Sequence, residues 1–134
     1  MSQENVELVR RLAKAIDGWN IDAVVSLVHP DFEAYVPPEF SAEPDTYRGR
    51  DGIRRYFDSF EVAMDEIRYD PVEIWDAGDS VVVAVRLTAR GRQTSIPVEQ
   101  RFAHLWGFRD GMAIGVRTYA SASEALEAAG LPTE

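Results

Sequence analysis

The sequence contains no cysteine, and only two of its 134 residues are histidine. Without thiols there are no disulfides, thiolate metal sites, iron–sulfur clusters or cysteine nucleophile. The two histidines, His29 and His104, are far apart in the chain and form no HExxH pair. The sequence also lacks a phosphate-binding loop, a dinucleotide fingerprint and a G-x-S-x-G nucleophile elbow. We therefore expect neither a metal nor another cofactor.

Basic residues and long apolar runs are also scarce. The sequence has 14 Lys and Arg residues and 23 Asp and Glu residues, which gives a formal net charge of −9. A field of that sign repels phosphate backbones and anionic lipid surfaces, so nucleic acid and membranes are poor partners. The longest aliphatic run, Val81 to Val85, is too short to span a bilayer, and the first residues lack the order of a signal peptide. These features predict a soluble, cytoplasmic protein.

The N-terminal half shows the periodicity of amphipathic helices. Apolar residues recur at helical spacing over 6–19, and a shorter pattern over 21–28 ends at His29-Pro30, because a residue before proline avoids the helical region. The strongest pattern predicts a helix from Asp51-Gly52 to about residue 66. Its apolar stripe consists of Ile53, Tyr56, Phe57, Phe60, Met64 and Ile67.

Extended segments are predicted between and after these helices. Short strands are expected over 32–36 and around Tyr47, separated by a proline-rich loop over 37–44. After the third helix the apolar period changes to two, which is typical of strands. The strands predicted there are 69–75, 80–89, 94–108 and 112–119.

Turn and cap signals complete the outline. The strand over 94–108 is expected to be kinked or bulged near Pro97, and Asp110-Gly111 indicates a hairpin. A capping box at 121–124 predicts a short last helix that ends at Gly130. Because an antiparallel sheet must cover one face, the predicted fold class is α+β, with one domain spanning 1–134. A curved, mainly antiparallel sheet would pack on the three helices of the N-terminal half and enclose a cone.

Four sequence strings carry a resemblance to a known family. They are IDAVVSLVHPDFEAYVPP (21–38), YRGRDGIRRYF (47–57), VEQRFAHLWGFRDGMAIGVRTY (98–119) and SEALEAAGL (123–131). Together they resemble the SnoaL-like branch of the nuclear transport factor 2-like superfamily, which includes ketosteroid isomerases and polyketide cyclases. The resemblance implies a cone-shaped fold with a pocket, but a fold alone implies no activity.

The acid–base positions that the resemblance implies hold other residues here. The isomerase base before a proline corresponds to Val36, and the tyrosine donor on the first helix corresponds to Leu12. The protonated aspartate of the third meander strand corresponds to His104, and the acidic residue of related epoxide hydrolases to Thr118. Because the standard isomerase mechanism needs a carboxylate base, a standard ketosteroid isomerase is not expected.

His104 is the candidate catalytic residue. It shares one face of its predicted strand with Val98, Gln100, Phe102, Trp106 and Phe108. That face is the more apolar one, so we expect it to look into the cone, where a polar group needs a partner. An imidazole there suits a general base or a hydrogen-bond donor to a ligand. The alternative is a core histidine that is satisfied by a neighbouring hydroxyl or carbonyl.

Polar and aromatic side chains around this face are the candidate ligand contacts. They are Gln100, Trp106, Tyr35, Tyr47, Thr118 and Tyr56. Each has the alternative of packing in the core or at its rim. On the opposite strand face, Glu99 and Arg101 are expected to pair with Arg86 or Arg117 across strands. That convex face is either a contact of a homodimer or a solvated surface.

Two interpretations of the function remain open. In the first, the protein binds a small, largely apolar molecule in the cone, as an isomerase, cyclase or hydrolase without the standard acid–base set. In the second, it is a non-catalytic binding or dimerisation module whose cone is filled by its own side chains. A cavity of several hundred cubic ångströms would favour the first and a filled cone the second.

Overall fold

The computed structural model describes residues 2–36 and 45–131, so the proline-rich loop predicted over 37–44 lies outside the described residues. Its helices are α1 (Ser2–Asp17), α2 (Ile21–Ser26), α3 (Gly49–Ala63) and α4 (Ala122–Ala128). Its strands are β1 (Val28–Val36), β2 (Asp45–Arg48), β3 (Met64–Asp76), β4 (Ser80–Gly91), β5 (Pro97–Arg109) and β6 (Met112–Tyr119). None of the helices within these residues is long and apolar enough to cross a membrane.

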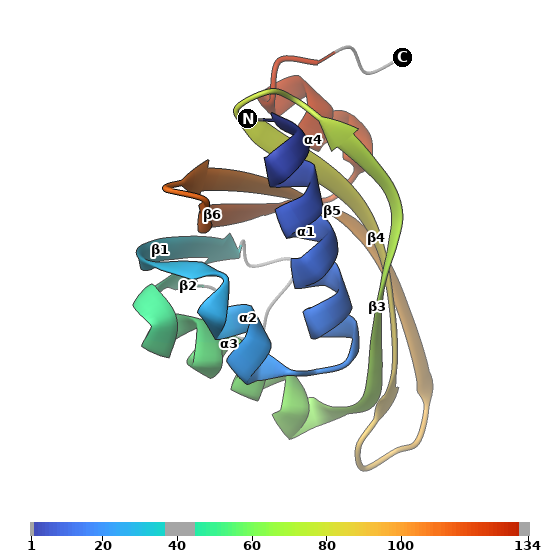
Figure 1. Cartoon of the computed structure of the whole chain (residues 1–134). Coiled ribbons are helices and arrows are strands. Elements are labelled where there is room, and N and C mark those ends of the chain that lie inside the picture. Colours follow the sequence, from blue (N-terminus) through green and yellow to red (C-terminus); the bar gives the residue numbers. More distant parts are fainter. Residues whose placement is uncertain (1, 37–44, 132–134) are drawn as a thin grey trace.

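All six strands form one sheet in the order β2-β1-β6-β5-β4-β3. Only the β1–β6 pair is parallel among the described pairs, and the run from β3 to β6 is an antiparallel meander. Asp110 and Gly111 both have positive φ, which confirms the predicted hairpin between β5 and β6. Figure 1 shows the long strands β3 to β5 bending around α1.

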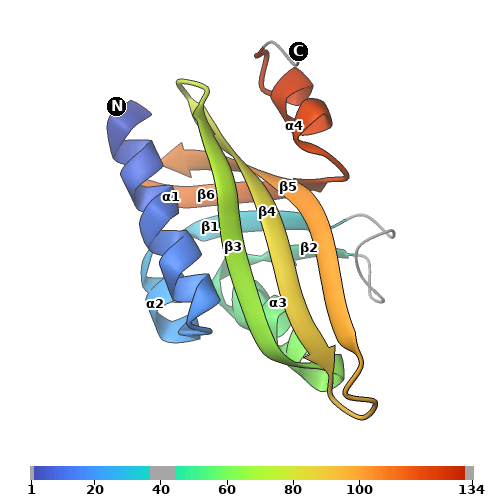
Figure 2. The ribbon, with the colours of Figure 1, turned by 90° about the vertical axis from the view of Figure 1, so that its right-hand side faces the viewer.

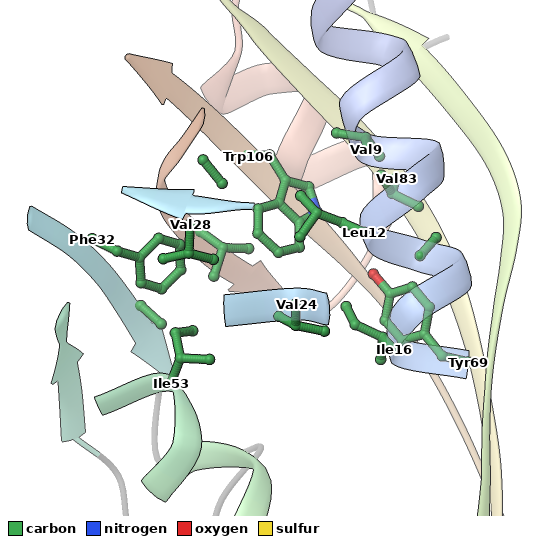
Figure 3. Close-up of a cluster of buried hydrophobic side chains, with 14 of the residues drawn as sticks. Val9, Leu12, Ile16, Val24, Val28, Phe32, Ile53, Tyr69, Val83 and Trp106 are labelled. Atoms are coloured by element: carbon green, nitrogen blue, oxygen red, sulfur yellow. The ribbon is translucent and has the colours of Figure 1, made fainter. Parts of the chain in front are cut away.

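The two faces of the sheet carry two separate apolar clusters. The larger one joins α1, α2 and α3 to the concave face, and Figure 3 shows its central side chains, among them Leu12, Phe32 and Val83. The smaller one holds α4 against the convex face through Val82 and Leu126. Figure 2 shows α4 on the other side of the strands from α1 and α3. The predicted fold class, a curved sheet on three helices with a short last helix, is confirmed.

Two predicted helix ends were wrong, for the same physical reason. The second helix ends at Ser26 and not at Val28, because Val28 already lies in β1 beside Ala113 of β6. The third helix ends at Ala63, because Met64 pairs with Gly91 of β4. In both places, pairing with a distant strand outweighs an apolar pattern that would also fit another helical turn.

The expected kink or bulge near Pro97 was also wrong, because the β4–β5 pairing has no register shift. β5 begins at Pro97, where a missing N–H removes no interior ladder bond. The preceding residues form the connection instead: Ser95 has a φ of 59°, and Ile96 N–H donates to Thr94 Oγ1 at 3.2 Å. The predicted last helix is confirmed, with Ser121 Oγ accepting from Glu124 N–H at 3.2 Å.

We predict that Gly52→Ala destabilises the fold by about 1–3 kcal/mol. A Cβ at Gly52 would lie 2.9 Å from the backbone carbon of Tyr47, where no side chain can move aside. Gly18→Ala is the matched control, because a Cβ there would lie 3.6 Å from the Lys14 carbonyl oxygen, an ordinary contact. Urea denaturation midpoints measure both. Equal midpoints for the two variants would contradict the close packing of α3 on β2.

Candidate functional site

A small cavity lies between the concave face of the sheet and the helices. It is lined by Ile16, Trp19, Val24, Val28, Ile53, Tyr56, Phe57, Phe60, Tyr69, Leu87, Phe102, His104, Trp106 and Val116. None of these described lining residues is an Asp, Glu, Lys or Arg. The cavity volume is about 40 Å³, room for a water molecule but far below the ~300–1,000 Å³ of typical ligand pockets.

His104 in the cavity wall has a defined partner. Its Nδ1 lies 2.8 Å from the hydroxyl of Tyr69, and the two rings are stacked at 5.8 Å between centroids. Both side chains are buried, at 6% and 3% exposure. In Figure 3 the Tyr69 hydroxyl points into the apolar cluster. This contact is the neighbouring hydroxyl that the core-histidine interpretation called for.

Burial fixes the charge state of this pair. Desolvation lowers the pKa of His104 to about 3. Burial likewise raises the pKa of Tyr69 far above its ordinary value; the nearby Tyr56 adds to the rise, and a hydrogen bond with Trp106 opposes it. Both groups are therefore uncharged at neutral pH. An imidazole with so low a pKa is a weak proton acceptor, so its chemistry here is hydrogen bonding more than proton transfer.

The hydrogen-bond chain also selects the histidine tautomer. An indole N–H can only donate, so the Tyr69 oxygen accepts from Trp106. The Tyr69 hydroxyl proton is then free to point at Nδ1 of His104. A neutral imidazole that accepts at Nδ1 carries its own proton on Nε2. His104 thus offers one N–H donor besides its contact with Tyr69.

A surface clamp holds Tyr69 in place. The Tyr69 N–H donates to Asp17 Oδ1 at 2.9 Å, and Arg68 donates to both carboxylate oxygens, at 2.9 and 3.0 Å. The hydrogen bond from Arg68 lowers the pKa of Asp17 most, although partial burial opposes it. The clamp joins the end of α1 to β3 directly below the buried tyrosine. It therefore fixes where the Tyr69 ring enters the core.

The structure places three of the predicted site residues in the cavity wall: His104, Trp106 and Tyr56. Tyr47 is fully buried behind Tyr56, at 5.1 Å between ring centroids. Thr118 is buried and pairs directly with His104 across β5 and β6, but it is not part of the wall.

Gln100 and Tyr35 lie outside the cavity. Gln100 has the expected strand parity but is exposed, because the β5–β6 pairing begins only at Ala103 and leaves that end of β5 uncovered. Tyr35 alternates with the buried residues Ala34 and Val36, so it faces outward. It is 44% exposed and lies 5.8 Å from the Arg117 guanidinium.

Sequence reasoning missed Tyr69 and Trp19 as site residues. Tyr69 stood at the start of a predicted strand with no sign of which face it takes. A bulge between Pro71 and Glu73 shifts the register of β3, so that Tyr69 faces the cavity while Trp75 packs on the convex cluster. Trp19 was expected on the apolar face of the first helix. It follows α1 with a φ of 53°, and this turn places it in the cavity wall.

Two residues that the resemblance aligned with acid–base positions are core residues here. Val36 is 2% exposed and Leu12 is fully buried. Within residues 2–36 and 45–131, no group of three or more His, Asp or Glu side chains is arranged to hold a metal ion. The described cavity thus offers hydrogen-bonding groups without a carboxylate.

Larger hollows lie on the surface, away from His104. A groove of about 710 Å³ runs along α1 and β3, and its charges pair with one another, for example Arg68 with Asp17 at 2.9 Å. On the convex face, Glu99 pairs with Arg86 of β4 at 3.2 Å, which confirms that expected cross-strand pair. Arg101 instead pairs with Glu99 of its own strand, at 3.3 Å. Because the groove along α1 and β3 is open to solvent and its Asp17 and Arg68 are already paired, it is a weaker ligand site than the cavity despite its size.

A curved six-stranded sheet over helices, with an uncharged hollow on its concave side, defines the class of nuclear transport factor 2-like folds. Residues 9–116 match the model of the SnoaL-like domain, and the chain belongs to this family. The resemblance drawn from the sequence strings is therefore confirmed. No curated protein sequence matches the chain.

Solved structures share the fold at low sequence identity. An NTF2-like protein of unknown function from Burkholderia pseudomallei has a TM-score of 0.78 at 20% identity, over 92% of this chain and 95% of that one. A protein of ketosteroid isomerase-like fold from Catenulispora acidiphila, in complex with trimethylamine, has a TM-score of 0.73 at 22% identity, over 95% of each chain. TerC, co-crystallised with polyporic acid, has a TM-score of 0.77 at 22% identity, over 95% of this chain and 98% of that one. Such identities establish the fold alone.

We predict that His104 stays neutral, with its proton on Nε2, throughout the range in which a free histidine titrates. Long-range ¹H–¹⁵N spectra measure the two ring nitrogens directly. Because the chain has two histidines, His29→Gln assigns the signals. A titration of His104 near pH 6.5, the ordinary value for histidine, or a proton on Nδ1 would contradict the hydrogen-bond chain.

The same burial predicts a pH dependence of stability. His104 takes up its proton below pH 6.5 in the unfolded chain but only near pH 3 in the folded one, so the unfolded state binds more protons between these values. Stability from this group is therefore complete above about pH 6.5 and falls as the pH drops, by up to about 1.4 kcal/mol per unit. Urea unfolding of the native chain and of His104→Phe is compared at pH 7, 6, 5 and 4. The carboxylates contribute equally to the pH dependence of both proteins, so the difference between the two curves is the contribution of His104. If the stabilities of the two proteins changed with pH in parallel, the predicted contribution of His104 would be absent.

Proposed function

We propose that the protein binds a small, uncharged, largely apolar molecule between the concave face of its sheet and its helices. One observation carries this proposal: the neutral His104–Tyr69 pair is set in a wall without described charged residues. A charged ligand would lose its hydration there without gaining an ionic partner. An apolar molecule with one polar group fits both the aromatic wall and the remaining N–H of His104.

The small cavity volume means that binding needs the wall to move. Trp19, Phe57 and Phe60 close one part of the wall through edge-to-face contacts, with 5.2 Å between the Trp19 and Phe57 centroids and 6.4 Å between Trp19 and Phe60. Phe60 is only half-buried and stands one turn before the end of α3. It is the lining residue that we expect to yield to a ligand. TerC with polyporic acid and the Catenulispora protein with trimethylamine are precedents for ligands on this fold.

Reaction chemistry of the isomerase, cyclase or hydrolase type is the finer part of the proposal. His104 is the group that would touch the reacting atoms, as a donor that polarises a bound oxygen. No carboxylate of the described wall is available to remove a proton. We therefore propose ligand binding as the main function. Any catalysis would be limited to steps that are assisted by polarising a bound oxygen, without a general base.

A second candidate function is favoured by the same 40 Å³ volume. A cone so nearly filled by its own side chains suits a non-catalytic module that acts through its convex face. α4 covers part of that face, and Tyr35 and Arg117 stand exposed on the part nearer β1. A homodimer through this remaining surface is the form that the second candidate takes.

Benzaldehyde is a suitable probe of the first candidate, because it is small, uncharged and aromatic with one oxygen. We predict that Phe60→Ala binds it about tenfold more tightly than the native chain, since the truncation makes room that the native cone lacks. His104→Phe weakens binding about three- to tenfold, the worth of one hydrogen bond. Calorimetry gives the affinities, and Val62→Ala, 79% exposed on the same helix, is the matched control.

The two candidates separate in this experiment. Binding that follows the order Phe60→Ala, native chain, His104→Phe supports the pocket. If none of these proteins binds benzaldehyde, the pocket proposal is wrong. Light scattering of the native chain then tests the second candidate, which requires a dimer that Tyr35→Glu dissociates.

A further inference from the structure

The cavity wall contains a second hydrogen-bond donor, and this one has no partner. Among the described residues, Trp19 Nε1 is the only buried side-chain nitrogen or oxygen without a hydrogen-bond partner. Buried polar groups are nearly always satisfied, since an unpaired one loses its hydration for nothing. Trp19 also lines the cavity together with His104. Trp19, whose N–H is unpaired, therefore lies in the wall of the cavity where the proposed ligand would bind.

Resting on the proposed function, we propose that Trp19 Nε1–H is a ligand contact that selects molecules carrying a neutral hydrogen-bond acceptor, such as a carbonyl oxygen. His104 offers its Nε2–H and not an acceptor, because its Nδ1 is occupied by the Tyr69 hydroxyl. Two residues that carry N–H donors, from different parts of the chain, thus line one cavity. An acceptor oxygen can pair with the indole N–H, whereas a hydrocarbon leaves it unpaired.

The rest of the wall narrows the ligand class further. With no Asp or Glu among the described lining residues, a cation finds no counter-charge. With no Lys or Arg there, and with His104 uncharged, an anion finds none either. The class is therefore a small, neutral, aromatic or aliphatic compound with an acceptor oxygen.

The geometry around Trp19 keeps the indole in place for this role. Its ring meets Phe57 edge to face at an interplanar angle of 88°, and Phe60 at 86°. The turn that carries it is closed by backbone bonds: Trp19 N–H donates to the Ile16 carbonyl at 2.9 Å, and Asn20 N–H to the Ala15 carbonyl at 2.9 Å. The Phe57 contact and the backbone turn remain when Phe60 yields, so they hold the donor in position before a ligand arrives and lower the entropy lost on binding.

The test compares benzaldehyde with toluene, which has nearly the same shape but no acceptor. In the Phe60→Ala background, which has the larger cavity, adding Trp19→Phe weakens benzaldehyde binding about three- to tenfold and leaves toluene binding within about twofold. Because a smaller ring also changes the packing, a second variant carries benzothienylalanine at position 19, which keeps the bicyclic shape and lacks the N–H. It shows the same selective loss. Trp75→Phe, on the convex cluster, is the control and changes neither affinity.

A spectroscopic measurement on the otherwise native Phe60→Ala protein complements the affinities. The chain has three tryptophans, so its indole ¹H–¹⁵N signals are few, and Trp19→Phe assigns the relevant one. That signal moves downfield with benzaldehyde and not with toluene. The inference is wrong if Trp19→Phe and the benzothienyl variant weaken the binding of both probes equally, or if the indole signal does not shift with benzaldehyde. The N–H would then donate to a trapped water or to an aromatic ring face. If neither probe binds at all, the proposed function itself fails.

Discussion

The hydrogen bond between the Tyr69 hydroxyl and His104 Nδ1 is the contact on which the interior depends. It joins β3 to β5 across the intervening strand β4, so it forms only because the sheet curves and turns both side chains inward. Breaking it leaves a polar group unpaired in an apolar core, at a cost of about 1–3 kcal/mol. The Asp17 clamp holds the backbone of Tyr69 from outside, and Trp106 completes the hydrogen bonding inside.

This contact also limits the chemistry of the site. Because the imidazole and the phenol are both neutral, the interior carries polar groups without carrying charge. The cost of burial is then met by hydrogen bonds instead of ion pairs, which suits a cone with little water. A site of this kind recognises a ligand by shape and by one or two donors. It has no proton acceptor that is strong at neutral pH.

The sequence was sufficient for the sheet, the four helices and the inward position of His104, because each depends on local periodicity or on strand parity. The sequence was not sufficient where pairing between strands far apart in the chain determines the end of an element or the direction of a side chain. The end of α3 at Ala63 follows from pairing with β4, and the inward turn of Tyr69 follows from a bulge that no residue pattern marks. Gln100 had the correct parity and pairs with Leu87 of β4, but β6 does not reach it on the other side. Trp19 was assigned to the core because tryptophan counts as apolar in a hydrophobicity pattern. Such a pattern cannot show that its N–H has no partner in the fold.

The burial of Val36 and Leu12 and the small volume of the cavity are connected. Val36 and Leu12 are buried in the main cluster, where a carboxylate or a phenol would need its own partner and solvent. Apolar side chains there pack closely, and close packing leaves only about 40 Å³ free. Apolar packing at these two positions therefore stabilises the closed cone. A ligand of this protein must displace side chains to enter, so part of its affinity is used in opening the wall near Phe60.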